Sequence, residues 1–272
     1  SMGARFFAAS FLLGIFLWIK IGKSFLQINL SQLLALALLG GLLLGLGLGM
    51  VTLAQYNDVP SGIVALLISA LPFWIAIFKA IEGTKTSALS WLGIGIGFMG
   101  VGILLQPELS KPNNNLHIFW MFMVIIGNLG WAFGTYITPR LDLPKNTFVI
   151  TFYQMLLGGV GISVAGILTD EQLHDFFDAS ISSWGWWLYL VLIGSIATYS
   201  AYVWLVANAP VGLISTYAYV NPVIAVFLGV VFLDEKVSIT LLLGAAVVIT
   251  GVFIVVKVES RESLKAEGDL DE

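Results

Sequence analysis

The residues best suited to bind a solute are uncharged polar and aromatic side chains that interrupt long apolar stretches. Several of them are three or four residues apart and would therefore share one face of a helix. Together they offer neutral hydrogen-bond donors and acceptors and aromatic faces, which suit an uncharged, zwitterionic or amphipathic molecule and can hold a cation against a ring. The alternative is that they form hydrogen bonds between helices. The candidate binding residues are Asn128, Trp131, Gln154, Tyr199, Tyr202, Tyr217 and Asn221.

Other kinds of chemistry lack the residues that they need. The sequence has no Cys and two His, so we expect no disulfide, metal site or cofactor. Charged residues nearest the apolar stretches, namely Arg5, Lys79, Asp234 and Glu235, lie near their ends, where long side chains reach water. This argues against exchange of phosphate esters or nucleotide sugars, and against an enzyme, which needs an acid, nucleophile or metal. The net charge of −4 comes largely from residues 259–272 and gives no sign of nucleic-acid binding.

The elements that must position these residues are membrane-spanning helices. The chain is 58% hydrophobic and 10% charged, with a mean hydropathy of +0.97, whereas a soluble domain carries about 25% charge. Continuous apolar runs predict an all-α membrane protein, because a β-barrel would alternate apolar and polar residues. Nine runs are long enough to span a bilayer: 6–22, 31–53, 60–81, 87–106, 117–138, 147–168, 185–206, 211–233 and 239–257.

The positive charges predict an orientation in the cytoplasmic (inner) membrane. Nine of the 12 Lys and Arg residues fall on one side if the runs alternate in direction. Cytoplasmic loops carry the excess of positive charge, so we expect a cytoplasmic C-terminus and an outside N-terminus. The acidic segment 258–272 is too polar to bury, and we expect it to be disordered.

An internal repeat with an offset of about 150 residues links two of the runs. Val59-Pro60-Ser61-Gly62 followed by Pro72 matches Ala209-Pro210-Val211-Gly212 followed by Pro222. The matched runs are five crossings apart, so the two copies would face opposite ways, as in secondary transporters with a midplane site. The mid-span residues Pro72 and Pro222 are hinge candidates, since proline interrupts helical hydrogen bonding; the alternative is that both only curve their helices.

The two copies are unequal in length. Residues 1–106 hold four runs and residues 117–257 hold five, so the first copy lacks a counterpart of 117–138. We favour a ten-helix bundle without its first helix in this chain; the alternative is a nine-span protein. Ten helices could enclose a path in a monomer, whereas nine could recruit a second chain in a homodimer.

Several motifs resemble the drug/metabolite transporter superfamily, EamA branch. They are Arg5-Phe6, Gly130-Trp131-Ala132-Phe133-Gly134, Gln154-Met155-Leu156-Leu157-Gly158-Gly159, residues 214–225, Leu233-Asp234-Glu235 and Leu243-Gly244-Ala245. The resemblance implies two inverted repeats of five helices and export of small metabolites or amino acids, with uptake in some relatives. We therefore expect a secondary transporter that works by alternating access on a small-molecule substrate within the lipid bilayer; the alternative is a channel or a non-transporting membrane scaffold.

Overall fold

In the computed structural model, the described part of the chain is helical and divides into two compact units. The first unit comprises Ser1–Gly49 and Ile137–Asn208, and the second comprises Met50–Tyr136 and Ala209–Glu272. Within the described residues there are helices, turns and bends but no strands. These residues are 2–83, 87–109, 115–168, 180–209 and 238–268, with six single positions: Ile214, Asn221, Ile224, Leu228, Val231 and Phe232.

Seven described helical segments are long and apolar enough to cross a membrane, rather than the predicted nine. They are Met2–Leu26, Leu30–Tyr56, Ser61–Ile81, Leu116–Arg140, Thr147–Val164, Ile181–Asn208 and Ile239–Val258. The predicted run 87–106 is the helix α6 (Ala88–Leu109), whose apolar part, Ala88–Leu104, is shorter. The predicted run 211–233 lies largely outside the described residues. The chain is thus an all-α membrane protein for which nine spans remain a prediction.

The first unit contains two π-helices, each of which forms the middle of a span. Its α1 and α8 are continuous helices, and Asn29 starts α2 by accepting a hydrogen bond from the Gln32 N–H. The main elements are α1 (Met2–Ile21), α2 (Leu30–Leu39), the π-helix η2 (Gly40–Leu48), α8 (Thr147–Leu168), α10 (Ile181–Tyr189), the π-helix η4 (Leu190–Tyr199) and α11 (Ser200–Asn208).

Helices α1 and α8 pack closely in opposite directions. A Cβ on Gly3 would lie 3.4 Å from the Gly159 carbonyl oxygen, and one on Gly14 would lie 2.9 Å from the Phe152 ring. The Ser10 hydroxyl donates to the Phe152 carbonyl oxygen at 3.2 Å. Since lipid tails are as apolar as the helices, close packing and hydrogen bonds, not burial from water, hold such pairs together.

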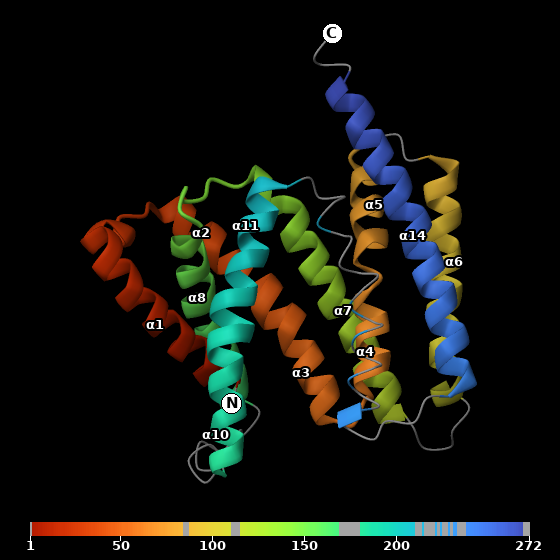
Figure 1. Cartoon of the computed structure of the whole chain (residues 1–272), viewed down its shortest axis with the longest axis horizontal. Helices are drawn as coiled ribbons and strands as arrows, with labels where there is room; N and C mark the ends of the chain where they lie inside the picture. Colours follow the sequence, from red (N-terminus) through yellow and green to blue (C-terminus); the bar gives the residue numbers. More distant parts are fainter. Residues whose placement is uncertain are drawn as a thin grey trace. The chain divides into compact units, whose positions relative to one another are not determined.

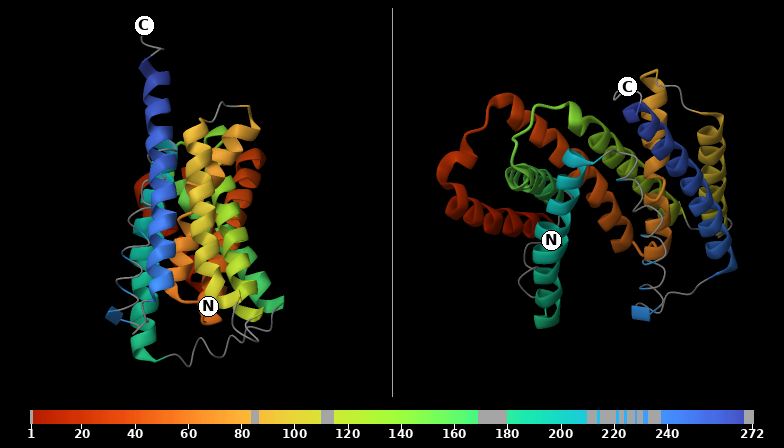
Figure 2. Two further views of the ribbon diagram at one scale, coloured as in Figure 1. Left: turned by 90° about the vertical axis from the view of Figure 1, so that its right-hand side faces the viewer. Right: turned by 45° about the horizontal axis from the view of Figure 1, so that its top comes forward.

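The second unit is built around an antiparallel pair, α6 and α14 (Figures 1 and 2). A Cβ on Gly93 would lie 3.0 Å from the Gly251 carbonyl oxygen, and one on Gly100 would lie 3.1 Å from that of Gly244. The absence of side chains at these four positions lets the backbones touch. The elements are α3 (Gly49–Tyr56), α4 (Ser61–Ile68), α5 (Leu71–Ile81), α6, α7 (Asn115–Ile137) and α14 (Ile239–Gly268).

Helix α14 continues beyond the predicted end of its run. It extends to Gly268, so the segment predicted to be disordered is helical up to that residue. The extension is rich in Glu, Lys, Arg, Ala and Leu, which are good helix formers, and glycine commonly ends a helix. A polar segment therefore propagates a helix that the membrane-spanning part has already nucleated.

Candidate functional site

The span that carries Pro72 is broken in the middle. Helix α4 ends at Ile68 and α5 begins at Leu71, with Pro72 in its first turn. Proline has no N–H to donate to the carbonyl four residues earlier, and its ring disfavours a continuous helix. The predicted interruption at Pro72 is confirmed, whereas its role as a hinge remains a prediction.

Side chains satisfy carbonyl groups at the break. The Ser69 hydroxyl donates to the Leu66 carbonyl oxygen at 2.6 Å, and Asn128 Nδ2 of α7 donates to the Leu67 carbonyl oxygen at 3.0 Å. Broken helices are tolerated at membrane depth where protein groups replace the missing backbone bonds. Asn128 therefore fixes α7 against the break.

Asn128 also keeps one unused acceptor. Its side chain is 4% exposed, and its Oδ1 atom has no hydrogen-bond partner among the described residues. Trp131 lies one turn further along α7 and is half-buried, and its carbonyl oxygen accepts from the Thr135 hydroxyl at 2.8 Å. Asn128 and Trp131 thus belong to the same unit as Pro72.

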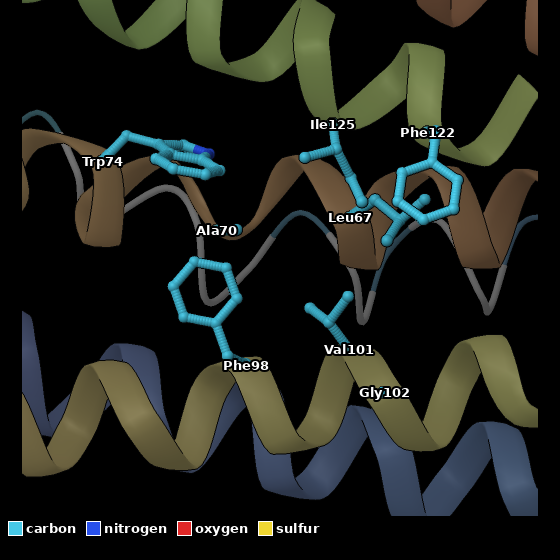
Figure 3. A pocket seen from close by; sticks show the side chains of 8 residues that line it. All are labelled: Leu67, Ala70, Trp74, Phe98, Val101, Gly102, Phe122 and Ile125. Atoms are coloured by element: carbon cyan, nitrogen blue, oxygen red, sulfur yellow. The ribbon is translucent and has the colours of Figure 1, made fainter.

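An open cavity of about 340 Å³ lies beside the break (Figure 3), and Phe98 and Phe122 in its wall are exposed. Phe98 packs edge-on against Trp74, with ring centroids 5.6 Å apart. Trp74 Nε1 is buried and has no partner within the described part of the chain. The wall is almost wholly carbon, and its residues are Leu67, Ala70, Trp74, Phe98, Val101, Gly102, Phe122 and Ile125.

Sequence reasoning missed Trp74 as a candidate site residue. The one feature of the sequence that could have identified Trp74 is its position, two residues after the predicted mid-span proline. Figure 3 shows its indole ring reaching over Ala70, with the nitrogen at the inner end. The break in the span thus brings the Trp74 ring to the cavity wall, while its N–H is buried.

A second polar cluster lies in the first unit. The Tyr199 hydroxyl donates to Gln154 Oε1 at 2.8 Å, and both side chains are buried. The Tyr199 and Tyr202 rings stack with centroids 6.1 Å apart and an interplanar angle of 26°. The structure therefore brings together three predicted site residues, one from α8 and two from the η4–α11 span.

The two π-helices of this unit flank the same part of α8. Gly40 begins η2, and a Cβ there would lie 2.7 Å from the Gln154 carbonyl oxygen; Tyr199 ends η4. The hydroxyls of Ser195 and Ser200 are buried without a hydrogen-bond partner among the described residues. Isolated π-helical turns occur frequently at functional sites.

The remaining predicted site residues are placed only in part. Asn221 is exposed, and Tyr217 and Pro222 lie outside the described residues. Asn128 and Trp131 belong to the second unit, whereas Gln154, Tyr199 and Tyr202 belong to the first. A single midplane site made by all of these residues remains a prediction. Among the described residues, no group of three or more His, Asp or Glu side chains could hold a metal ion.

Comparison with known proteins gives the family. Residues 118–257 match the EamA-like transporter family. The chain is 37% identical over 253 residues to "Uncharacterized inner membrane transporter YedA" of Escherichia coli (strain K12), covering 93% of this chain and 79% of that protein. It is 28% identical to "Protein PecM" of Dickeya dadantii (strain 3937), covering 81% and 72%.

A solved structure supports the fold. A chain described as "Crystal structure of protein" superimposes with a TM-score of 0.58 at 16% identity, covering 93% of this chain and 85% of that one. At this identity the likeness concerns the fold alone. With the family match and the relative at 37% identity, the protein belongs to the EamA-like family of membrane transporters, within the drug/metabolite transporter superfamily.

Proposed function

We propose that this protein is a secondary transporter that exports a small neutral, zwitterionic or amphipathic, amino-acid-like metabolite across the cytoplasmic membrane. Two inverted copies, 1–106 and 117–257, would alternate access to the solute. The proposal retains nine spans in this chain and a cytoplasmic C-terminus. Family membership supports transport, and the internal contacts of each unit support the inverted copies.

The observation that carries this proposal is the reciprocal contact between α6 and α14. With the sequence offset of 151 residues, Gly93 corresponds to Gly244 and Gly100 corresponds to Gly251. Gly93 meets Gly251, and Gly100 meets Gly244. When residue i contacts the counterpart of j, and j contacts the counterpart of i, the two elements are related by a twofold axis. Reciprocal glycine contacts are what two inverted copies of one helix produce.

The π-helices support the same repeat independently. They begin at Gly40 and Leu190, which are 150 residues apart, and each lies in the middle of its span. Their sequences, GGLLLGLGL and LVLIGSIATY, have little in common. A matching backbone feature without matching residues indicates corresponding positions in two copies of one fold.

Contacts between loops support the predicted sidedness. Asn29 Nδ2 and Gln32 Nε2 donate to the two carboxylate oxygens of Asp142, each at 3.4 Å. These bonds place the loop before α2 beside the loop before α8, so the two loops lie on one side of the membrane. Lys20, Lys23, Arg140 and Lys145 flank these loops, and positive charge favours the cytoplasmic side.

Flux measurements test the function directly. The purified full chain is reconstituted in proteoliposomes, and uptake of a panel of radiolabelled amino acids is measured with and without a pH gradient. We expect saturable flux for at least one neutral amino acid above that of protein-free liposomes. Ionic conductance without saturable flux would favour a channel, and the absence of both would favour a scaffold.

A further inference from the structure

We propose that the surface where α1 meets the start of α8 (Figure 1) binds an anionic phospholipid. We call this surface the α1–α8 face, and its residues are Leu12, Phe16 and Lys20 of α1, Phe148 of α8 and Lys145 just before α8. The acyl chains of the lipid would lie along the apolar residues, and the phosphate group would accept from the two lysines. All five residues belong to the first unit. The inference goes beyond the proposed function, because it concerns a lipid and not the transported solute.

The apolar part of the α1–α8 face is made of exposed side chains in membrane-spanning segments. Leu12, Phe16 and Lys20 follow one another at intervals of four residues, so they lie on one side of α1, and all three are exposed. The Phe16 ring packs edge-on against the exposed Phe148 ring, with centroids 5.5 Å apart. Lipid tails are as apolar as these side chains and pack against them. The two rings therefore join α1 and α8 into one surface for acyl chains.

Two lysines lie just beyond this apolar part. Because α1 and α8 run in opposite directions, the turn after Phe16 and the residues before Phe148 lie at the same end of the pair. Lys20 is in the last turn of α1 and Lys145 precedes Phe148 by three residues, and both are exposed. Asn146 fixes the start of α8, since its Oδ1 atom accepts from the Phe148 N–H at 2.9 Å. The α1–α8 face thus changes from apolar to basic along its length, as a phospholipid changes from acyl chain to phosphate.

The charges at this end of the unit favour an anion. It carries four cations, Lys20, Lys23, Arg140 and Lys145. The one acidic residue of the first unit outside residues 169–179 is Asp142, and its two carboxylate oxygens accept from side-chain amides at the start of α2. The N-terminal end of α8 adds the positive end of a helix dipole beside Lys145. The proposed topology places this end at the cytoplasmic surface, where clusters of Lys and Arg attract anionic lipids.

Titration with lipids, followed by native mass spectrometry, tests the site. The purified full chain in detergent is titrated with dioleoyl phosphatidylglycerol, which is anionic, or with dioleoyl phosphatidylcholine, which has the same acyl chains but no net charge. We expect the double variant of Lys20→Gln with Lys145→Gln to bind phosphatidylglycerol about 10-fold or more weakly than the unmodified protein does. Its binding of phosphatidylcholine should be unchanged.

Two further double variants serve as controls. Lys257 of the second unit is also exposed and also lies beside an exposed ring, with its Nζ atom 5.5 Å from the Phe253 ring centroid. Lys257→Gln with Lys265→Gln removes the same charge from α14, and we expect it to leave the binding of phosphatidylglycerol unchanged. Lys20→Arg with Lys145→Arg keeps both charges and should bind this lipid as tightly as the unmodified protein does.

The outcomes separate this inference from the proposed function. Equal affinity for the two lipids, or an equal loss of affinity in the two glutamine double variants, would overturn the assigned site. Competition by glycerophosphoglycerol, the headgroup without acyl chains, as strong as that by the intact lipid would show that a soluble anion binds instead. If Lys20→Gln lowers Tm equally with either lipid, Lys20 acts on the helix end of α1 and the inference is wrong. None of these measurements requires transport, so the absence of solute flux would refute the proposed function and leave the lipid site standing.

Discussion

The two units depart from α-helical geometry in different ways. In the first unit, η2 and η4 widen the helix but remain continuous with their neighbours. In the second, the α-helical pattern is interrupted by a turn at Ser69 and Ala70, where the Ala70 N–H donates to the Leu67 carbonyl oxygen three residues earlier. The side chains of Ser69 and Asn128 also donate to carbonyl groups at this break. A π-helix keeps its hydrogen bonds within the segment, whereas a break depends on side chains from elsewhere. The π-helices of the first unit therefore need no side chain from another helix, whereas the break in the second unit is bonded to α7 through Asn128.

Single-residue deletions should separate these two designs most sharply. A π-helical turn accommodates one extra residue, so deleting Leu192 from η4 should restore an α-helix and leave both flanks in register. Deleting Leu157 from α8 should turn one part of that helix by about 100°. The contacts of Gln154 and Gly158 lie on either side of that deletion, so one set must be lost.

Thermal unfolding in detergent measures the difference. We expect the Leu157 deletion to abolish the folded protein and the Leu192 deletion to retain a cooperative transition. If both deletions unfold the protein, the π-helix does not simply accommodate one residue more than an α-helix would. If the Leu192 variant folds but has lost flux, the π-helical geometry itself is needed for transport.

A side chain added at the glycine contact between α6 and α14, which is formed by Gly93, Gly100, Gly244 and Gly251, should produce the next largest effect. A Cβ on Gly251 would lie 2.6 Å from both the Gly93 carbonyl oxygen and the Gly97 backbone nitrogen, so α6 and α14 would have to separate. Overpacking typically costs about 1–3 kcal/mol and occasionally more, and rigid backbone on both sides places Gly251→Val at or above about 3 kcal/mol. Chemical denaturation compares it with Gly95→Val, which should be nearly neutral. Equal stability of the two variants would show that α6 and α14 are not closely packed at Gly251.

The sequence predicted some of these features and not others, for physical reasons. The break at Pro72 was predictable because proline removes a local hydrogen bond. The shared helix face of Tyr199 and Tyr202 followed from their spacing. The partner of Asn128 was not predictable, because it is a backbone carbonyl, which no residue type marks. The π-helices were missed because an added residue in a helix has no compositional pattern, and Gly40–Leu48 reads as an ordinary apolar run.

Removal of the Asn128 side chain should have an intermediate effect. Asn128→Leu withdraws one of the two donors to the Leu67 carbonyl oxygen, which also accepts from the Ala70 N–H at 3.3 Å, and the loss of one such buried hydrogen bond costs about 1 kcal/mol. Thr135→Val is the matched control on α7, because its hydroxyl donates to a carbonyl oxygen of its own helix and its loss leaves no carbonyl at a break. Denaturation of both variants gives the difference. If Thr135→Val is destabilised as much as Asn128→Leu, the break does not depend on its tertiary contact.

The smallest effect should come from the Tyr199–Gln154 hydrogen bond. Double-mutant cycles in membrane proteins give about 0.6 kcal/mol on average for such bonds, because the unfolded chain in the bilayer also finds partners. In a cycle of Tyr199→Phe and Gln154→Leu, we expect a coupling energy of about 0.5–1.5 kcal/mol. Both single variants should keep their π-helix, since its backbone bonds do not involve either side chain. A coupling energy well above that of Asn128 with its carbonyl group would reverse the comparison, because the first unit would then also depend on a tertiary side-chain contact.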